Sequence, residues 1–308
     1  MLDISDIRPN GKSYNGNTKK SGITYNGIDY IVKFPKSDDM SVYCEYIASE
    51  LICSIGVPCH KVELGIYNGT VVAIIQDFTS GTKLTLHSYK DTKQSSEDTD
   101  IGDKEYTYDD VIYLIDKHLK MSDSDKTDAQ NKFWDMFICD AIIGNRDRHW
   151  GNWGYLNNGN GYKFAPLYDN GAGLYPGINK VIDQYMEAQT REKFIYDRVF
   201  VFPASLFKVK RPDRSYRSNY AEIFKDLSIN RVFADRVRRM RQNIGYGFIF
   251  NSMLDICKNT DLSWKYCRFF TEIATMRYMC IILRLDFNKA YNMIEGELLK
   301  HDQESDQT

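Results

Sequence analysis

The sequence lacks several signals that mark common protein classes. Its seven cysteines are an odd number, lie far apart and form no C-x-x-C pair. This spacing argues against a disulfide framework or a zinc site and favours reduced thiols. The charges almost cancel, with 40 Lys and Arg against 42 Asp and Glu. A net charge of −2 gives no support for direct nucleic-acid binding, which we do not expect.

Long apolar runs are also missing. The most apolar segments, such as "YMCIILRL", are too short to span a bilayer and have charges nearby. The first residues, "MLDISDIRPN", have neither the basic nor the apolar region of a signal peptide. We therefore expect no membrane span and a cytoplasmic location, with secretion by a non-classical route left open.

What is present is an ordinary globular composition over 308 residues, 43% hydrophobic and 27% charged. This length allows one large domain or two lobes. Two β-rich runs, at 21–35 and 61–78, each contain Asn-Gly, which is the strongest short-range signal for a β-hairpin. The segment 37–58 between them has helical apolar spacing, with Ser37, Asp38 and Asp39 as possible N-caps and Gly56 and Pro58 as the stop.

The composition then changes. Residues 87–110 are polar and acidic, which predicts a surface excursion or connector. Helical patterns dominate from about Val111 onward, and we expect helices within 109–120, 126–144, 220–227, 231–250 and 265–299. The order predicts an N-terminal β-rich lobe over 1–80, a connector and helical lobe over 81–300, and a disordered tail over 301–308.

The stretch "GNRDRHWGN" directly follows the apolar run "FICDAII" and concentrates polar side chains. Asp147 and Asn152 suit a metal–phosphate site, in which a carboxylate orients or deprotonates a hydroxyl and an amide oxygen reaches Mg²⁺. Alone, this short pattern also fits a polar turn. The run "GYKFAPLYDNG" further along predicts a strand that ends at Asp169, whose carboxylate would be a second magnesium ligand. The two features together favour phosphoryl transfer.

Lys33 lies among apolar residues in the predicted strand "YIVKFP". In a nucleotide site it would contact phosphate oxygens and be held by a carboxylate of the next helix, with Glu45 the first choice and Glu50 the second. The alternative is an exposed lysine on a hairpin.

Upstream, "NGKSYNGNTKKSGI" contains Gly16 and Gly22, together with Lys19 and Lys20. Glycines let backbone N–H groups approach phosphates, but the pattern matches no standard phosphate loop and also fits a plain flexible loop. The run "AIIQDF", with Gln76 and Phe78, would face the adenine in a two-lobed site, or is simply a buried strand.

His149 could be catalytic or could brace its loop by hydrogen bonds. The basic runs 208–218 and 236–242 could face an anionic substrate, although a solvated turn or helix face is the plainer interpretation.

These motifs resemble one family. "GNRDRHWGN" and "APLYDNG", with "IVKFP" and "CEYIASELICSIGVP" upstream, are similar to the HipA-like serine/threonine kinases of bacteria, in particular to short members without the extra N-terminal subdomain. The match runs from about Ser13 to Asp169. The "DRH…N" piece also resembles the catalytic loop of phosphatidylinositol 3- and 4-kinases. The resemblance implies an α+β, two-lobed protein-kinase-like fold with ATP and Mg²⁺ in the cleft.

The resemblance also assigns roles to residues. Asp147 would be the catalytic aspartate, Asn152 and Asp169 would hold Mg²⁺, and Lys33 would contact ATP. Gly16, Lys20 and Gly22 would belong to the phosphate loop. Ser13 has the spacing of the autophosphorylated serine in this family, with Thr18 and Ser21 as rivals.

We therefore expect an ATP-dependent serine/threonine protein kinase that phosphorylates itself and a protein substrate. The resemblance suggests an antitoxin-like partner, but the missing subdomain leaves its mode of binding open. A phosphoinositide or small-molecule kinase on the same fold and a partner-binding pseudokinase remain as alternatives.

Overall fold

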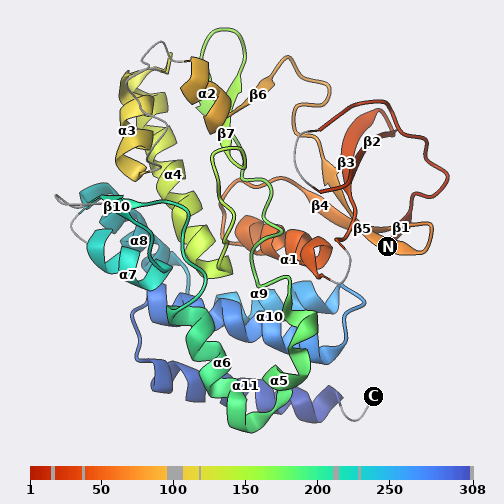
Figure 1. The fold of residues 1–308 in the computed structure, drawn as a ribbon, viewed down its shortest axis with the longest axis vertical. Coiled ribbons are helices and arrows are strands. Elements are labelled where there is room, and N and C mark those ends of the chain that lie inside the picture. The colour runs from red at the N-terminus through yellow and green to blue at the C-terminus, as the bar shows by residue number, and fades with distance from the viewer. Residues whose placement is uncertain are drawn as a thin grey trace.

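The structure is a computed structural model, which describes residues 1–14, 18–36, 39–95, 107–117, 119–210, 215–227 and 230–305. Residues 209–210, 215–216 and 303–305 are described by their backbone alone. A strand-rich part at the N-terminus and a larger helical part make up the fold (Figure 1).

The N-terminal part is a five-stranded sheet with the order β1-β4-β5-β3-β2. Both predicted hairpins are confirmed. Asn26 and Gly27 have φ of 50° and 77°, and Asn68 and Gly69 have 48° and 76°, as a tight turn requires. The short first strand, which pairs in parallel with β4, was not predicted. The strands are β1 (Leu2–Asp3), β2 (Lys20–Tyr25), β3 (Ile28–Lys33), β4 (Val62–Tyr67) and β5 (Thr70–Gln76).

Helix α1 (Ser41–Ser54) crosses between this sheet and the helical part, where it packs on β4, β5 and α9 (Tyr246–Lys258) (Figure 1). Of its predicted caps, Asp39 accepts hydrogen bonds from the backbone N–H and the hydroxyl of Ser41, while Ser37 and Asp38 lie outside the described residues. Gly56, with φ of 82°, follows the helix as predicted.

The prediction of a plain connector from residue 87 was wrong in its first part. Strand β6 (Thr85–Ser88) pairs with β7 (Gly154–Asn157), and helix α2 (Tyr89–Ser95) follows at once. The aromatic side chain of Tyr89 is buried and stacks on Trp153, with ring centroids 4.6 Å apart. One such long-range contact outweighs a locally polar composition. Residues 96–106 lie outside the described part.

The helical part contains the predicted helices with altered boundaries. The run 231–250 is two helices, divided at Ile244 and Gly245, and a π-helical turn, η3 (Tyr278–Ile282), interrupts the run 265–299. Helices α5 and α6 were missed. The helices are α3 (Tyr108–Lys117), α4 (Asp123–Ile143), η1 (Ile178–Lys180), α5 (Ile182–Met186), α6 (Ala188–Phe200), α7 (Tyr220–Asp226), α8 (Arg231–Asn243), α9 (Tyr246–Lys258), α10 (Trp264–Arg277) and α11 (Phe287–Ser305). The short strands β9 (Val209–Lys210) and β10 (Ser215–Tyr216) pair with each other.

The strand predicted to run to Asp169 is shorter than expected. Strand β8 (Tyr162–Phe164) ends five residues earlier and pairs with β7. Beyond it, the backbone forms a bridge between Cys59 and Leu167, which brings the segment alongside the end of α1. Pro166 lacks the N–H that a continued ladder would need.

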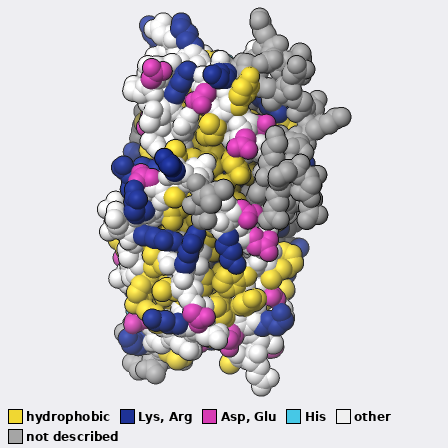
Figure 2. All heavy atoms as spheres, turned by 90° about the vertical axis from the view of Figure 1, so that its left-hand side faces the viewer, with side chains coloured by type: hydrophobic (Ala, Val, Ile, Leu, Met, Phe, Trp, Pro, Cys, Tyr) yellow, Lys and Arg dark blue, Asp and Glu magenta, His cyan; other side chains and the backbone are white. Residues whose placement is uncertain are grey.

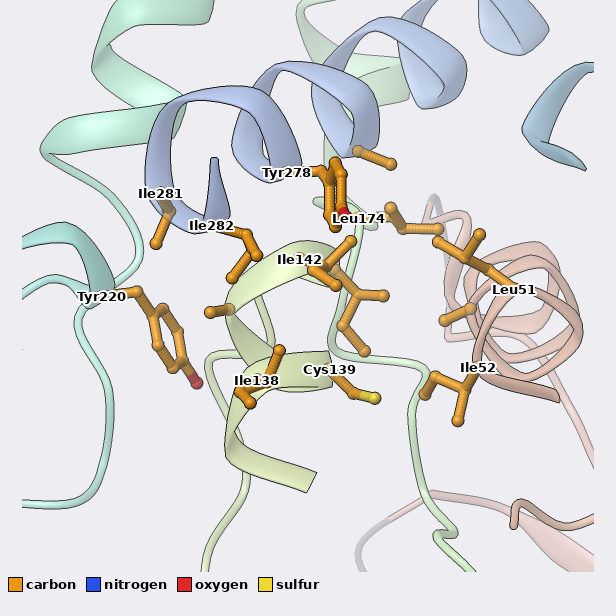
Figure 3. Packing of buried hydrophobic residues seen from close by; sticks show 14 of the residues in the cluster. Leu51, Ile52, Ile138, Cys139, Ile142, Leu174, Tyr220, Tyr278, Ile281 and Ile282 are labelled. Atoms are coloured by element: carbon orange, nitrogen blue, oxygen red, sulfur yellow. The ribbon is translucent and has the colours of Figure 1, made fainter. Parts of the chain in front are cut away.

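The largest core surrounds the C-terminal end of α4. Ile138, Cys139 and Ile142 of this helix meet side chains from α1 and η3, as the close view shows (Figure 3). The core therefore fixes the loop that follows α4, which contains the predicted catalytic residues.

The basic run on α8 belongs largely to ion pairs. Arg236 binds Asp135 of α4 through two nitrogens, at 2.7 and 2.6 Å, and Arg239 pairs with Asp235 on its own helix. On this side of the molecule, Lys and Arg side chains alternate with Asp and Glu (Figure 2). The plainer prediction, a solvated turn or helix face, fits the exposed Arg238 and Arg239, whereas Arg236 is partly buried in its pair with Asp135.

At the C-terminus, α11 continues to Ser305, so the expectation of disorder from residue 301 was wrong for 301–305. Asp302 accepts hydrogen bonds from Trp264 and Arg268, which hold this end against α10.

The predicted domain boundary near residue 80 falls between β5 and β6 and stays a prediction. Among the described residues, no helix has the length and apolarity required to cross a membrane.

Candidate active site

Three charged side chains that are distant in sequence meet at the edge of the N-terminal sheet. The Lys33 ammonium lies 2.5 Å from Oε2 of Glu45 and also donates to Oδ1 of Asp169. Strand β3 positions the lysine, helix α1 the glutamate, and the loop after β8 the aspartate. Lys33 is only 9% exposed, so the alternative of a solvent-exposed lysine is wrong, and Glu45 rather than Glu50 is its partner.

Electrostatics keep all three groups charged. Burial alone would lower the pKa of Lys33, but the carboxylates of Glu45 and Asp169 outweigh this effect and raise it above the ordinary value. Burial would raise the pKa of Glu45 and of Asp169, whereas the Lys33 charge lowers both below their ordinary values. The cluster is therefore a paired network with a net negative charge, to which a cation can be added.

Glu45 also anchors the segment that contains Asp169. Its carboxylate accepts hydrogen bonds from the backbone N–H of Asn170 at 2.8 Å and of Gly171 at 3.0 Å. Nε2 of His60 lies 3.0 Å from Oε1 of the same Glu45 carboxylate. A Cβ at Gly171 would stand 2.9 Å from Oε2 of Glu45, so this close approach needs glycine. Asp169 itself has φ of 60°, a left-handed conformation that these bonds hold.

Arg148 joins the loop after α4 to the same segment. It is fully buried and binds Asp140 of α4 through Nε and Nη2, at 3.0 and 2.9 Å. Its remaining N–H groups donate to the carbonyls of Asn152 and Tyr168 and to Oδ1 of Asn170. One guanidinium therefore sets the position of the Asp147–Asn152 loop relative to Asp169.

Asp147 and Asn152 lie on this scaffold in different environments. Asp147 is exposed, and its backbone N–H donates to the side chain of Asn145. Asn152 is buried, and its Nδ2 donates to the carbonyl of Asp147 at 2.9 Å. This bond orients the amide, and among the described residues its Oδ1 receives no hydrogen bond. A carboxylate and an amide oxygen thus remain available.

Most of these residues open onto one cavity of about 320 Å³, although Asn152 is not part of its lining. Lys33, Glu45, Asp147 and Asp169 line it together with Arg146. The described residues contain no cluster of three or more His, Cys, Asp and Glu side chains that would form an all-protein metal site. Asp169 and Asn152 match instead the sparse oxygen set with which Mg²⁺ is held when phosphates complete its coordination. The donor set therefore fits Mg²⁺ bound with a nucleotide.

Of the predicted phosphate-loop residues, the structure describes Lys20 and Gly22. Lys20 is opposite Lys33 in the β2–β3 register, so both side chains lie on the same face of the hairpin. Burial and the neighbouring Lys33 lower the pKa of Lys20, although Asp169 partly opposes this. Gly16 lies outside the described residues, and Ser13 is exposed.

Gly22 has a packing role that the sequence did not indicate. A Cβ there would stand 2.4 Å from Oδ1 of Asn10 and 3.1 Å from the Tyr14 ring, so the segment 9–14 lies directly on this position. Lys12 pairs with Asp29 at 2.5 Å, and the Tyr14 hydroxyl donates to Asp77 at 3.3 Å. The segment that contains Ser13 is therefore pinned between β2 and the end of β5.

Gln76 and Phe78 are not among the residues that line the 320 Å³ cavity. The Gln76 N–H donates to the carbonyl of Lys61, and the Phe78 ring lies 6.2 Å from that of Tyr168. Their predicted position beside adenine stays a prediction.

Sequence reasoning missed the residues that brace the site. Asp140, Asn170 and His60 were given no role, although all three are buried and hydrogen-bonded. For Asp140 a signal was available, because a lone carboxylate inside the apolar run "FICDAII" needs a partner. His149 braces its own loop, since its Nδ1 accepts from the Gly151 N–H at 3.0 Å.

The sequence matches a family model, described as the HipA-like C-terminal domain, over residues 13–244. The chain belongs to this family. A HipA-like relative, the serine/threonine-protein kinase CtkA of Helicobacter pylori, is 30% identical over 266 residues, which cover 81% of this chain and 77% of CtkA.

Solved structures agree with the HipA-like fold. The crystal structure described as a Helicobacter pylori proinflammatory kinase CtkA has a TM-score of 0.77 at 26% identity and covers 96% of this chain and 98% of that one. HipA of Shewanella oneidensis, solved with HipB and operator DNA, matches with a TM-score of 0.57 at 14% identity. The match covers 95% of this chain and 69% of the Shewanella chain. The predicted family and two-part kinase-like fold are confirmed.

Proposed function

We propose that this chain is a Mg·ATP-dependent serine/threonine protein kinase that also phosphorylates itself. The observation that carries the proposal is the meeting of Lys33, Glu45 and Asp169 with Asp147 on one cavity. Asn152 does not line this cavity, but its side chain is hydrogen-bonded to the backbone of Asp147. A catalytically dead relative usually lacks one of these groups, and here the set is complete. The relationship to a named serine/threonine kinase supports the choice of acceptor.

Bound Mg·ATP would supply the phosphoryl group and neutralise part of its charge. The chain's own groups then have separate tasks. The Lys33 ammonium would contact phosphate oxygens, and Glu45 would hold it in place. Asp169 and Asn152 would offer oxygen ligands to Mg²⁺. The exposed carboxylate of Asp147 would accept a hydrogen bond from the acceptor hydroxyl and orient it. It would take the proton as the hydroxyl oxygen bonds to the γ-phosphorus and the bond from this phosphorus to the departing ADP breaks.

Self-phosphorylation would fall on Ser13. This serine is exposed and lies between Lys12 and Tyr14, whose contacts to Asp29 and Asp77 pin the segment. A phosphate there would add negative charge beside two aspartates and favour release of the segment, which would silence the enzyme. Tandem mass spectrometry of the labelled chain tests this site. We expect Ser13→Ala to lose most of the labelling. Phosphate found on Thr18 or Ser21 would instead make that residue the self-phosphorylation site.

The acceptor class separates the proposal from its alternatives. The full chain is incubated with γ-labelled ATP and Mg²⁺ in three mixtures: alone, with a general protein substrate, and with phosphoinositide vesicles. We expect label on protein serine or threonine. Label found only on lipid or on a small molecule, and never on protein, would contradict the protein-kinase assignment. Nucleotide binding without label in any mixture would indicate a pseudokinase.

Partners and location stay predictions. The Shewanella relative was solved with HipB, but at 14% identity this likeness shows the fold alone. The antitoxin-like partner predicted above would be found by co-purification with the product of a neighbouring gene. A cytoplasmic location would be tested by cell fractionation.

A further inference from the structure

A second cavity, of about 270 Å³, adjoins the catalytic one. Arg146 and Ala172 line both cavities, and Arg146 directly precedes Asp147. An occupant of the second cavity would therefore lie beside the place where the acceptor hydroxyl meets Asp147.

Among the described residues, the lining of this second cavity includes positively charged side chains and no negatively charged ones. Arg146, Arg198 and Arg277 contribute three guanidinium groups, and the other lining residues are apolar, apart from the Tyr175 hydroxyl and the backbone. Among the described residues, none of the three arginines has a carboxylate partner. Arg146 is exposed and Arg198 is half-buried, whereas Arg277 is buried, and a buried charge without a charged partner costs stability.

Arg277 is the most buried of the three, at 2% exposure. Its Nε donates to the carbonyl of Ala141 at 2.7 Å, and its Nη1 donates to the carbonyls of Arg198 and Phe202. Its Nη2 is buried and has no hydrogen-bond partner in the part of the chain that the structure describes. Burial lowers the pKa of Arg277 to about 10, so the group remains charged at neutral pH.

Arg198 presents a second unmatched donor. Its guanidinium carbon lies 3.9 Å from the centre of the Tyr175 ring and 4.9 Å from that of Phe194, which hold the group in position. Its Nε is buried, and no described residue accepts a hydrogen bond from it. Arg198 and Arg277, which both line the cavity, therefore each have one buried N–H group without a partner among the described residues.

The backbone around this cavity is unusual as well. Leu174 and Tyr175 have φ of 55° and 62°, a conformation that is rare for residues other than glycine. The π-helical turn η3 begins directly after Arg277. Strained backbone and π-helical turns are both found often at functional sites. The strain costs stability, which the surrounding structure must offset.

We propose that this cavity binds an anionic side chain of the protein substrate, close in sequence to the phosphorylated residue. The inference rests on the proposed protein-kinase function. The guanidinium groups of Arg146, Arg198 and Arg277 would attract the anion by their charge, and the apolar walls would contact the methylene groups of its side chain. A carboxylate and a phosphorylated residue share this chemistry, and the experiment distinguishes them.

The test uses arrayed serine peptides in which one flanking position at a time is Glu, Gln, phosphoserine or Ala. We expect the full chain to phosphorylate peptides with an anion at one particular position about ten-fold more efficiently than their neutral counterparts, the scale of one charge-assisted hydrogen bond. Whichever of Glu and phosphoserine gives the larger effect identifies the anion.

The variant is Arg198→Gln, because Arg277 also holds the ends of α4 and α6 and its replacement endangers folding. Arg198→Gln should lose the preference but still phosphorylate neutral peptides and itself. Arg198→Lys, which keeps the charge, should retain part of the preference. The matched control is Arg238→Gln, an exposed arginine paired with Asp235 on α8, which should behave as the wild type does.

Equal labelling of anionic and neutral peptides by the wild type would overturn the inference and leave the kinase assignment intact. The same holds if the chain labels itself but no peptide. A chain that labels neither itself nor peptides would contradict the proposed function instead.

A binding measurement tests the cavity without catalysis. Inorganic phosphate is titrated into the Lys33→Met chain, which lacks the Lys33 ammonium of the nucleotide site, and the thermal midpoint is followed. We expect phosphate to raise the midpoint, and to do so much less in Lys33→Met with Arg198→Gln. Identical curves for the two chains would reject the anion site.

Discussion

At the scale of single residues, the site separates two aspartates by their surroundings. Asp169 pairs with Lys33 and is half-buried, whereas Asp147 is exposed and has a side chain available to a hydroxyl. The same residue type can therefore hold a metal at one position and orient a nucleophile at the other.

The first prediction follows from this division. Asp147→Ala should leave Mg·ATP binding nearly intact and reduce kcat at least about 100-fold, because only transition-state interactions are lost. Asp169→Ala should weaken Mg·ATP binding itself. Nucleotide titration at several Mg²⁺ concentrations, with kcat measured in parallel, separates the two. Asp255→Ala, on the exposed face of α9, is the control, and near-normal turnover by Asp147→Ala would end the assignment.

The second prediction concerns the buried Arg148–Asp140 pair. Arg148→Met leaves the Asp140 charge unpaired and fully buried, which should lower the free energy of unfolding by about 3–5 kcal/mol. The exposed pair of Arg238 and Asp235 is the comparison, since Arg238→Gln should cost about 1 kcal/mol or less. Urea unfolding measures both, and similar losses for the two variants would show that Arg148 does not brace the site.

At the scale of elements, local signals were informative where the backbone itself determines the structure. Asn-Gly predicted both hairpins because the turn needs two positive φ angles, which the structure has. Strand β6 and helix α2 were missed because their residues are locally polar and become ordered only through β7 and Trp153. Strand β8 was predicted too long because the approach to Asp169 is stabilised by contacts to α1 rather than by a ladder.

The third prediction tests the packing of segment 9–14 on β2. Gly22→Ala would place a methyl group against Asn10 and displace the segment, so KM for ATP should rise. Gly296→Ala is the matched control, because open space surrounds that position in α11 and helix propensity should increase stability by about 0.5–1 kcal/mol. An unchanged KM in folded Gly22→Ala would show that this segment does not contribute to nucleotide binding.

At the scale of the whole molecule, the two parts of the fold meet through charge. Lys33 and Asp169 are 136 positions apart, and Glu45 is 125 positions from Asn170. The sequence indicated which residue types a phosphotransferase needs, and the family resemblance gave their roles. The sequence ranked Glu45 ahead of Glu50 as the partner of Lys33, and the structure agrees. The sequence did not show that Asp169 would also reach Lys33, nor that Arg148 and Asp140 would hold the two loops together, because such pairings depend on the three-dimensional packing of distant elements.

The fourth prediction is the pH dependence of this junction. The folded pKa of Glu45 lies below its unfolded value of about 4.3, so the unfolded chain binds more protons between the two values. The contribution of Glu45 is therefore present above pH 4.3 and is lost as the pH falls towards the folded pKa. Without nucleotide, Glu45→Gln should be less stable at pH 7 and lose stability less steeply on acidification. Parallel curves for wild type and variant would contradict the pairing.

The central claim is that Asp147, Asn152, Asp169 and Lys33 form a working phosphotransferase site. Intact mass spectrometry of the full chain after incubation with Mg·ATP tests it most directly. We expect the wild type to gain the mass of one phosphate and Asp147→Ala to gain none. No gain in a folded, nucleotide-bound wild type, or the same gain in both chains, would contradict the account.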